Sequence, residues 1–90
     1  MTNELFEDLV RQALAALPPK LQQHAAEVPI VTMSAPPPHA PKESVVAFVQ
    51  CPTHLRFEVY KSGFDQGTEQ EVVEKLKTVL TEEFSFYFEC

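Results

Sequence analysis

The most reactive side chains in this chain are three histidines and two cysteines, and their spacing keeps them apart. His24, His39 and His54 are predicted on a short helix, a proline-rich loop and a strand. No pair has the spacing that brings two imidazoles to one zinc ion. Cys51 and Cys90 are 39 residues apart, which fits no metal-binding pattern. We therefore expect no metal site and no cofactor, with each histidine facing solvent.

The two cysteines have different expected environments. Cys51 ends an apolar run and is predicted to be a small core residue. Cys90 is the last residue, and we expect an exposed thiol because no neighbouring base lowers its pKa. Residues 1–4 show no basic region followed by an apolar stretch, so we expect no signal peptide. Together these features predict a cytoplasmic protein with reduced thiols.

Other patterns of catalytic residues are weak. The serines lack a Gly-x-Ser-x-Gly setting, and neither glycine belongs to a phosphate-binding motif. Glu82 and Glu83 are adjacent near the end of an expected helix, where neighbouring side chains point about 100° apart. We therefore expect this pair to be a solvated helix end and not a shared acid–base site.

The charge balance limits the classes of partner. Thirteen acidic and seven basic residues give a net charge of −6. No basic face is apparent, so we expect no nucleic-acid binding. No apolar run approaches the roughly 18 residues of a membrane span, so we expect no membrane association. The acidity favours either solubility alone or a basic protein partner.

The hydrophobic spacing predicts two helices and a strand in the first part of the chain. Residues 3–17 have an amphipathic pattern that Thr2 or Asn3 can cap, and Pro18-Pro19 ends it. Pro19 can open a short second helix over residues 19–26. An apolar strand follows over residues 28–33, where Pro29 favours a strand start or a sheet edge.

A proline-rich loop separates this strand from two more. Residues 34–42 contain four prolines and are expected to be a surface linker, although a Pro-x-x-Pro spacing also allows recognition by a proline-binding domain. Residues 44–50 form an apolar strand, and residues 54–61 alternate as a half-solvated strand, so the two suggest a hairpin. A turn over residues 62–67 leads to a helix that Thr68 and Glu71 cap.

The last stretch, residues 84–89, is compatible with two structures. Phe84, Phe86 and Phe88 alternate as in a strand, and aromatic residues favour strands. Leu80, Phe84 and Phe88 also keep the four-residue spacing of a helix. We predict a strand here, with the three phenylalanines buried on one face. The predicted fold is one α+β domain over residues 1–90, with helices on one face of a small, mostly antiparallel sheet in the order α-α-β-β-β-α.

Several segments carry a resemblance to one known family. They are Phe6–Val10 and Ala13-Leu14, then Leu17-Pro18 and Val28–Val31, followed further on by residues 52–57 and the helix at residues 71–80. This order of a phenylalanine-led helix, a Leu-Pro break, a short helix and an apolar strand is similar to the small zincin-like metallopeptidases of bacteria. The resemblance implies that the chain continues into the family's active-site helix.

That helix carries His-Glu-x-x-His in the family, where two histidines bind zinc and the glutamate acts on zinc-bound water. The aligned residues here are Glu82 to Phe86. Glu83 falls on the catalytic glutamate, and Glu82 and Phe86 fall on the two ligand positions. A phenyl ring cannot bind zinc. The chain ends at Cys90, so we expect no later ligand. The resemblance therefore implies a non-catalytic member.

Three functions follow as expectations. The first is a non-enzymatic zincin-like binding or regulatory protein. The second is an acidic small inhibitor or immunity-type protein that binds a basic partner. The third is a metallopeptidase with an atypical site.

Overall fold

The chain forms helices and strands in the predicted order. The computed structural model describes residues 1–50 and 55–89. Its elements are α1 (Asn3–Ala15), α2 (Pro19–Glu27), β1 (Ile30–Met33), β2 (Val46–Gln50), β3 (Leu55–Tyr60), a 3-10 helix (Lys61–Phe64) and α3 (Glu69–Glu89). The α+β class and the order α-α-β-β-β-α are confirmed. The expected environment of Cys51 and the positions of His54 and Cys90 lie outside the described residues.

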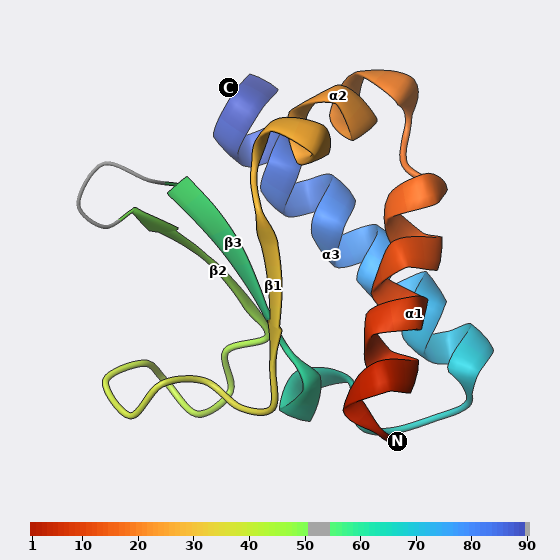
Figure 1. Cartoon of the computed structure of the whole chain (residues 1–90), viewed down its shortest axis with the longest axis vertical. Helices are drawn as coiled ribbons and strands as arrows, with labels where there is room; N and C mark the ends of the chain where they lie inside the picture. Colours follow the sequence, from red (N-terminus) through yellow and green to blue (C-terminus); the bar gives the residue numbers. More distant parts are fainter. Residues whose placement is uncertain (51–54, 90) are drawn as a thin grey trace.

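The sheet has the strand order β1-β3-β2, with β3 in the centre. β2 and β3 pair antiparallel as the expected hairpin, with Phe48 opposite Phe57. β1 pairs parallel to β3, with Ile30 opposite Phe57 and Met33 opposite Tyr60. The sheet is therefore mixed, with one pair of each kind. The reason is visible in Figure 1, where the long segment after β1 crosses the end of the sheet and carries the chain to its far edge.

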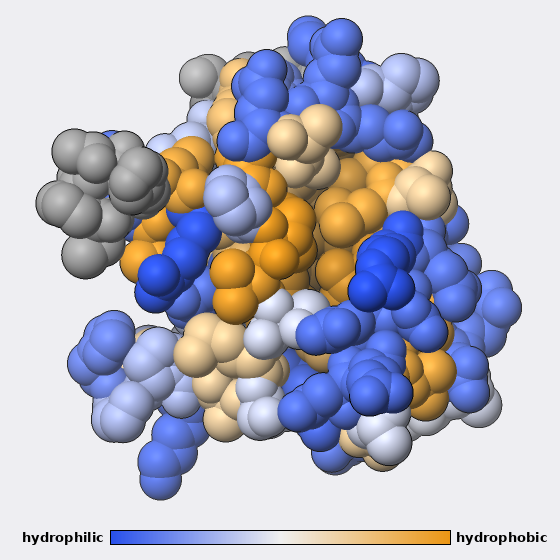
Figure 2. All heavy atoms as spheres, viewed as in Figure 1, coloured by the Kyte–Doolittle hydropathy of each residue, from blue (hydrophilic) through white to orange (hydrophobic). Residues whose placement is uncertain are grey.

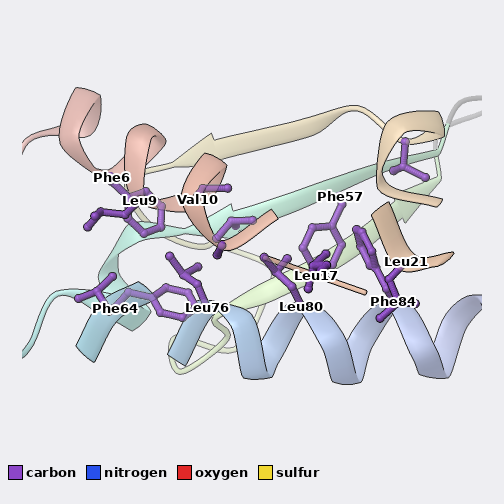
Figure 3. Packing of buried hydrophobic residues seen from close by; sticks show 14 residues of the cluster. Phe6, Leu9, Val10, Leu17, Leu21, Phe57, Phe64, Leu76, Leu80 and Phe84 are labelled. Carbon is purple, nitrogen blue, oxygen red and sulfur yellow. The ribbon is translucent and has the colours of Figure 1, made fainter. Parts of the chain in front are cut away.

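All three helices lie on the same side of the sheet, with α1 and α3 side by side (Figure 1). Figure 3 shows the core between them, where side chains of α1 and α3 meet Phe57 of β3. The members of this cluster come from every helix, from β3 and from the segments that flank α2, and they are Phe6, Leu9, Val10, Ala13, Leu17, Leu21, Val28, Phe57, Val59, Phe64, Val72, Leu76, Leu80 and Phe84. The helices therefore lie on one face, as the sequence predicted.

Both long helices begin at the caps that the sequence predicted. The Leu5 backbone N–H donates to Thr2 Oγ1 at 3.1 Å at the start of α1. At the start of α3, Glu71 N–H donates to Thr68 Oγ1 and Thr68 N–H donates to Glu71 Oε1, both at 3.2 Å. This reciprocal pair is a capping box, which satisfies two amides that the helix itself leaves free.

The expected strand over residues 84–89 is wrong, because α3 continues through this segment to Glu89. The four-residue spacing of Leu76, Leu80 and Phe84 keeps one stripe of the helix in the core, and all three side chains are fully buried. Aromatic residues cost only tenths of a kcal/mol each in a helix, whereas burying a phenylalanine side chain stabilises by about 1.5–3 kcal/mol. Core packing therefore outweighs the local strand preference.

The expectation of a half-solvated face on β3 is also wrong for two residues. Alternation does place Arg56, Glu58 and Tyr60 on the side away from the helices, because Phe57 and Val59 face the core. Yet Glu58 is 2% exposed and Tyr60 1% exposed. β3 is the central strand, and Glu58 has Val31 on one side and Ala47 on the other. Its carboxylate also accepts hydrogen bonds from Arg56 and Tyr60 on the same strand, so Glu58 has neighbours on all three strands.

β2 forms one edge of the sheet. Tyr60 N–H donates to Val45 O at 2.9 Å, and hydrogen bonding alternates along an antiparallel pair. The backbone groups of Val46, Phe48 and Gln50 therefore point away from β3. Among the described residues, no further strand pairs with this edge. None of the helices in the described ranges is both long and apolar enough to cross a membrane.

Candidate binding surface

The three positions that the resemblance assigns to a zinc motif lie on the last turns of α3. Glu82 is exposed, Glu83 is half-buried, and Phe86 is 74% exposed. Phe84, between them, is fully buried against Phe57, with ring centroids 5.0 Å apart. The helix thus turns Phe86 outward, and the phenyl ring is not a ligand. A helix at this stretch is what the resemblance implied.

The histidines do not gather around these positions. His24 on α2 is half-buried and lies flat on the ring of Phe88, at 4.4 Å and 3° between the ring planes. The expectation that His24 is a solvent-facing polar residue is therefore wrong, because its ring packs against α3. His39 is exposed in the proline-rich loop. Within residues 1–50 and 55–89, no group of three or more His, Cys, Asp or Glu side chains could hold a metal ion.

An aromatic cluster joins the end of α3 to β2 and β3. Phe48 of β2 is its centre, stacked on Tyr87 at 4.2 Å and packed against Phe57 at 4.6 Å. Phe84 and Phe88 close the cluster, with centroids 5.5 and 6.0 Å from Phe48. The strand prediction for residues 84–89 does not contain this cluster, because it places Phe84, Phe86 and Phe88 on one face. The four-residue spacing of Leu80, Phe84 and Phe88 indicates the helix, but it does not indicate the contact with Phe48.

Two aromatic side chains at the end of α3 are exposed on the surface. Phe86 is 74% exposed and Tyr87 is 45% exposed. Helical spacing places Glu83 one turn before both rings, and Glu82 one turn before Phe86. We call these four residues the acidic–aromatic surface. Isolated exposed apolar residues are common, but two adjacent aromatic rings beside two carboxylates form a larger feature.

The charge of α3 is strongly uneven. The helix carries six acidic and two basic residues, so it supplies −4 of the net charge of −6. Both bases are in its first half and have partners. Lys75 Nζ donates to Gly63 O at 2.7 Å, and Lys77 Nζ lies 3.5 Å from Glu74 Oε1. Residues 79–89 contain three acidic residues and no base. The acidic–aromatic surface therefore lies in a segment whose own ionisable side chains are all acidic.

The opposite side of the sheet holds a second polar cluster. Glu58 accepts hydrogen bonds from Arg56 Nε and from the Tyr60 hydroxyl, both at 2.8 Å. Burial and the Glu58 carboxylate raise the pKa of Tyr60 to about 12. The Tyr60 hydroxyl is therefore a fixed donor near neutral pH. Because the polar groups of this cluster form hydrogen bonds with one another, we assign the cluster a structural role.

A hollow of about 410 Å³ lies between α1 and β1. Its apolar floor comes from Val10, Leu14 and Ile30, and Glu7 and Arg11 form its rim. Figure 2 shows apolar side chains in the middle of this face, surrounded by hydrophilic ones. Glu7 is held in place by Thr32, whose hydroxyl lies 3.2 Å from Glu7 Oε1. The hollow has no group of catalytic side chains.

No protein-family model matches this chain, and no curated protein is significantly similar to it. The zincin-like family therefore stays a hypothesis that depends on the residues quoted above.

Proposed function

We propose that this chain is a non-enzymatic zincin-like protein that acts by binding another protein. One observation carries the proposal. The residue aligned with the second zinc ligand, Phe86, is an exposed phenyl ring on the outer side of α3. A catalytic zinc site needs three protein ligands that converge on one point and a base beside the metal-bound water. Glu82, Glu83 and Phe86 do not supply that set.

The test of the non-enzymatic character is metal content together with hydrolysis. The chain is purified without an affinity tag, dialysed against zinc-containing buffer and then against buffer alone, and analysed for metal. We expect less than one zinc per chain and no cleavage of a fluorogenic peptide mixture. One retained zinc, with hydrolysis that is lost in Glu83→Gln and kept in the control Glu69→Gln, would instead establish a metallopeptidase with an atypical site.

A second candidate function is an acidic inhibitor or immunity-type protein that binds a basic partner. It is favoured by the −4 charge of α3, which lies on one helix and is not spread evenly. The two candidates differ in the partner's chemistry. Capture by a basic partner weakens as salt is added, because surface electrostatics are screened. A defined cationic ligand therefore distinguishes electrostatic binding from binding that depends on apolar contacts alone.

A further inference from the structure

We propose that the acidic–aromatic surface binds an arginine side chain carried by a basic segment of a partner protein. This inference deepens the proposed function, because it assumes that the chain is a binding protein. Glu83 would accept the hydrogen bonds of the guanidinium group, and the rings of Phe86 and Tyr87 would provide the surface on which its planar group lies.

Helical geometry supports this arrangement. Glu83 is three residues before Phe86 and four residues before Tyr87, and side chains with these spacings are neighbours on a helix. Tyr87 cannot turn freely, because its ring is stacked on Phe48 at 4.2 Å. A half-exposed ring that is fixed on its inner side offers its outer side to a ligand. One carboxylate therefore lies within reach of two aromatic rings.

The chemistry of this surface selects arginine over other side chains. Arginine is always charged, forms paired hydrogen bonds with a carboxylate, and stacks on aromatic rings. Lysine carries the same charge but lacks the planar group. Cation–π contacts with exposed rings are weakly favourable, so the rings add to the carboxylate's attraction.

Charge argues against a second copy of this chain as the occupant. Residues 79–89 carry only acidic charges, and the whole chain has a net charge of −6. Two copies joined through this surface would bring like charges together, which is unfavourable. A basic segment of another protein has the complementary charge and buries the same aromatic rings.

The experiment uses the full chain and defined peptides. Hexa-arginine is titrated into the ¹⁵N-labelled protein at low salt, and amide shifts are followed by NMR. Hexa-citrulline is the matched uncharged control, and hexa-lysine tests the planar group. We expect the largest shifts at residues 82–88, no shifts with hexa-citrulline, and binding by hexa-lysine that is several-fold weaker.

Variants then locate the contact. Glu83→Gln is expected to weaken hexa-arginine binding about tenfold, which corresponds to about 1.4 kcal/mol. Phe86→Leu keeps an apolar side chain but removes the ring, and we expect about three- to fivefold weaker binding. Phe86→Tyr should bind like the parent. Glu69→Gln removes one charge from the other end of the same helix and should change binding less than twofold. Circular dichroism checks that each variant remains folded.

Several results would overturn the inference. These are equal weakening by Glu69→Gln and Glu83→Gln, equal binding of hexa-citrulline, and no binding of hexa-arginine. Self-association that Phe86→Ala abolishes would make a second copy the occupant and also overturn it. None of these outcomes changes the zinc and hydrolysis results, so the inference can fail while the proposed function stands.

Discussion

Phe84 and Phe86 are two residues apart on α3 and face opposite directions: the first is fully buried and the second is 74% exposed. Positions i and i+2 on a helix differ by about 200° in direction. The inner ring packs on Phe57 in the core, and the outer ring belongs to the acidic–aromatic surface. Two identical side chains thus have separate roles, one in stability and one in the proposed binding.

Alanine substitutions at these two positions should have very different effects. Phe84→Ala removes a fully buried ring and should lower the free energy of unfolding by about 3–5 kcal/mol. Phe86→Ala should change the free energy of unfolding by less than about 0.5 kcal/mol, because the Phe86 side chain is mostly exposed and is not part of the core. Urea unfolding of both variants measures the difference. Equal destabilisation by the two substitutions would contradict the helical assignment of this segment.

The hydrogen bond between Tyr60 and Glu58 should be important for stability. Tyr60→Phe removes the donor to Glu58 Oε1 and leaves a carboxylate oxygen of a 2% exposed side chain without that partner. We expect a loss of about 1–3 kcal/mol in the free energy of unfolding. The control is Tyr87→Phe, which removes a hydroxyl from a partly exposed ring and should be nearly neutral. Similar losses in both variants would argue against a special role for the buried bond.

Tyr60 also predicts how stability depends on pH. Its pKa is raised to about 12 in the folded protein, whereas in the unfolded chain it should be near 10.0. The folded state therefore keeps the proton more tightly. This contribution to stability is complete below about pH 10 and is lost as the pH rises towards 12. Phenolate absorbance should show a late titration step near pH 12 that is absent in Tyr60→Phe. An absorbance titration without this late step in the parent would contradict the prediction.

Gly63 is packed against the residue that leads into β2. A Cβ atom added at this position would lie 2.9 Å from Val45 Cβ, which is closer than real Cβ atoms approach, and a tight 3.1 Å from Val45 Cα. We expect Gly63→Ala to destabilise the protein by about 1–3 kcal/mol, because the backbone of the neighbouring segment must move. Ser62→Ala, at an exposed neighbouring position, is the matched control. A thermal melt of each variant makes the comparison, and an unchanged Gly63→Ala melting temperature would refute the close contact.

The proline-rich segment should be the first site of proteolysis. Lys42 is exposed and lies outside the helices and strands, whereas Lys75 and Lys77 are on α3. Backbone in a helix resists the extended conformation that a protease needs, so trypsin should cut after Lys42 first. Mass spectrometry of early fragments identifies the cut. Initial cleavage within α3 would show that the helix opens more easily than the loop.

The sequence predicted most of the fold because its hydrophobic spacing is regular. Residues 3–17, the caps at Thr2 and Thr68, and the β2–β3 hairpin all depend on local patterns, and the structure has each of them. Two features depend on tertiary contacts instead. Phe84 belongs to a helix because it meets Phe57 across the core, and Glu58 is buried because β1 pairs beside β3. Neither partner is near in sequence, so local spacing could not reveal them.

The sequence singled out residues of the candidate site, but it did not predict the directions or contacts of their side chains. Glu82, Glu83 and Phe86 were singled out by alignment with a metal motif. What these side chains can bind depends on the direction in which α3 presents them. The strand prediction buried Phe86, whereas the helix exposes it. The stack of Phe48 on Tyr87 joins residues 39 positions apart, and no local sequence pattern predicts such a contact.

The open edge of β2 has a consequence for colloidal behaviour. Residues 44–50 contain no charge, proline or glycine, which are the features that usually prevent one sheet edge from pairing with another. Repulsion between molecules of net charge −6 then becomes the main protection against intermolecular strand pairing. That repulsion vanishes at the isoelectric point, about 4.9. Mild acid should therefore turn a dispersed protein into one that precipitates, before the fold itself is lost.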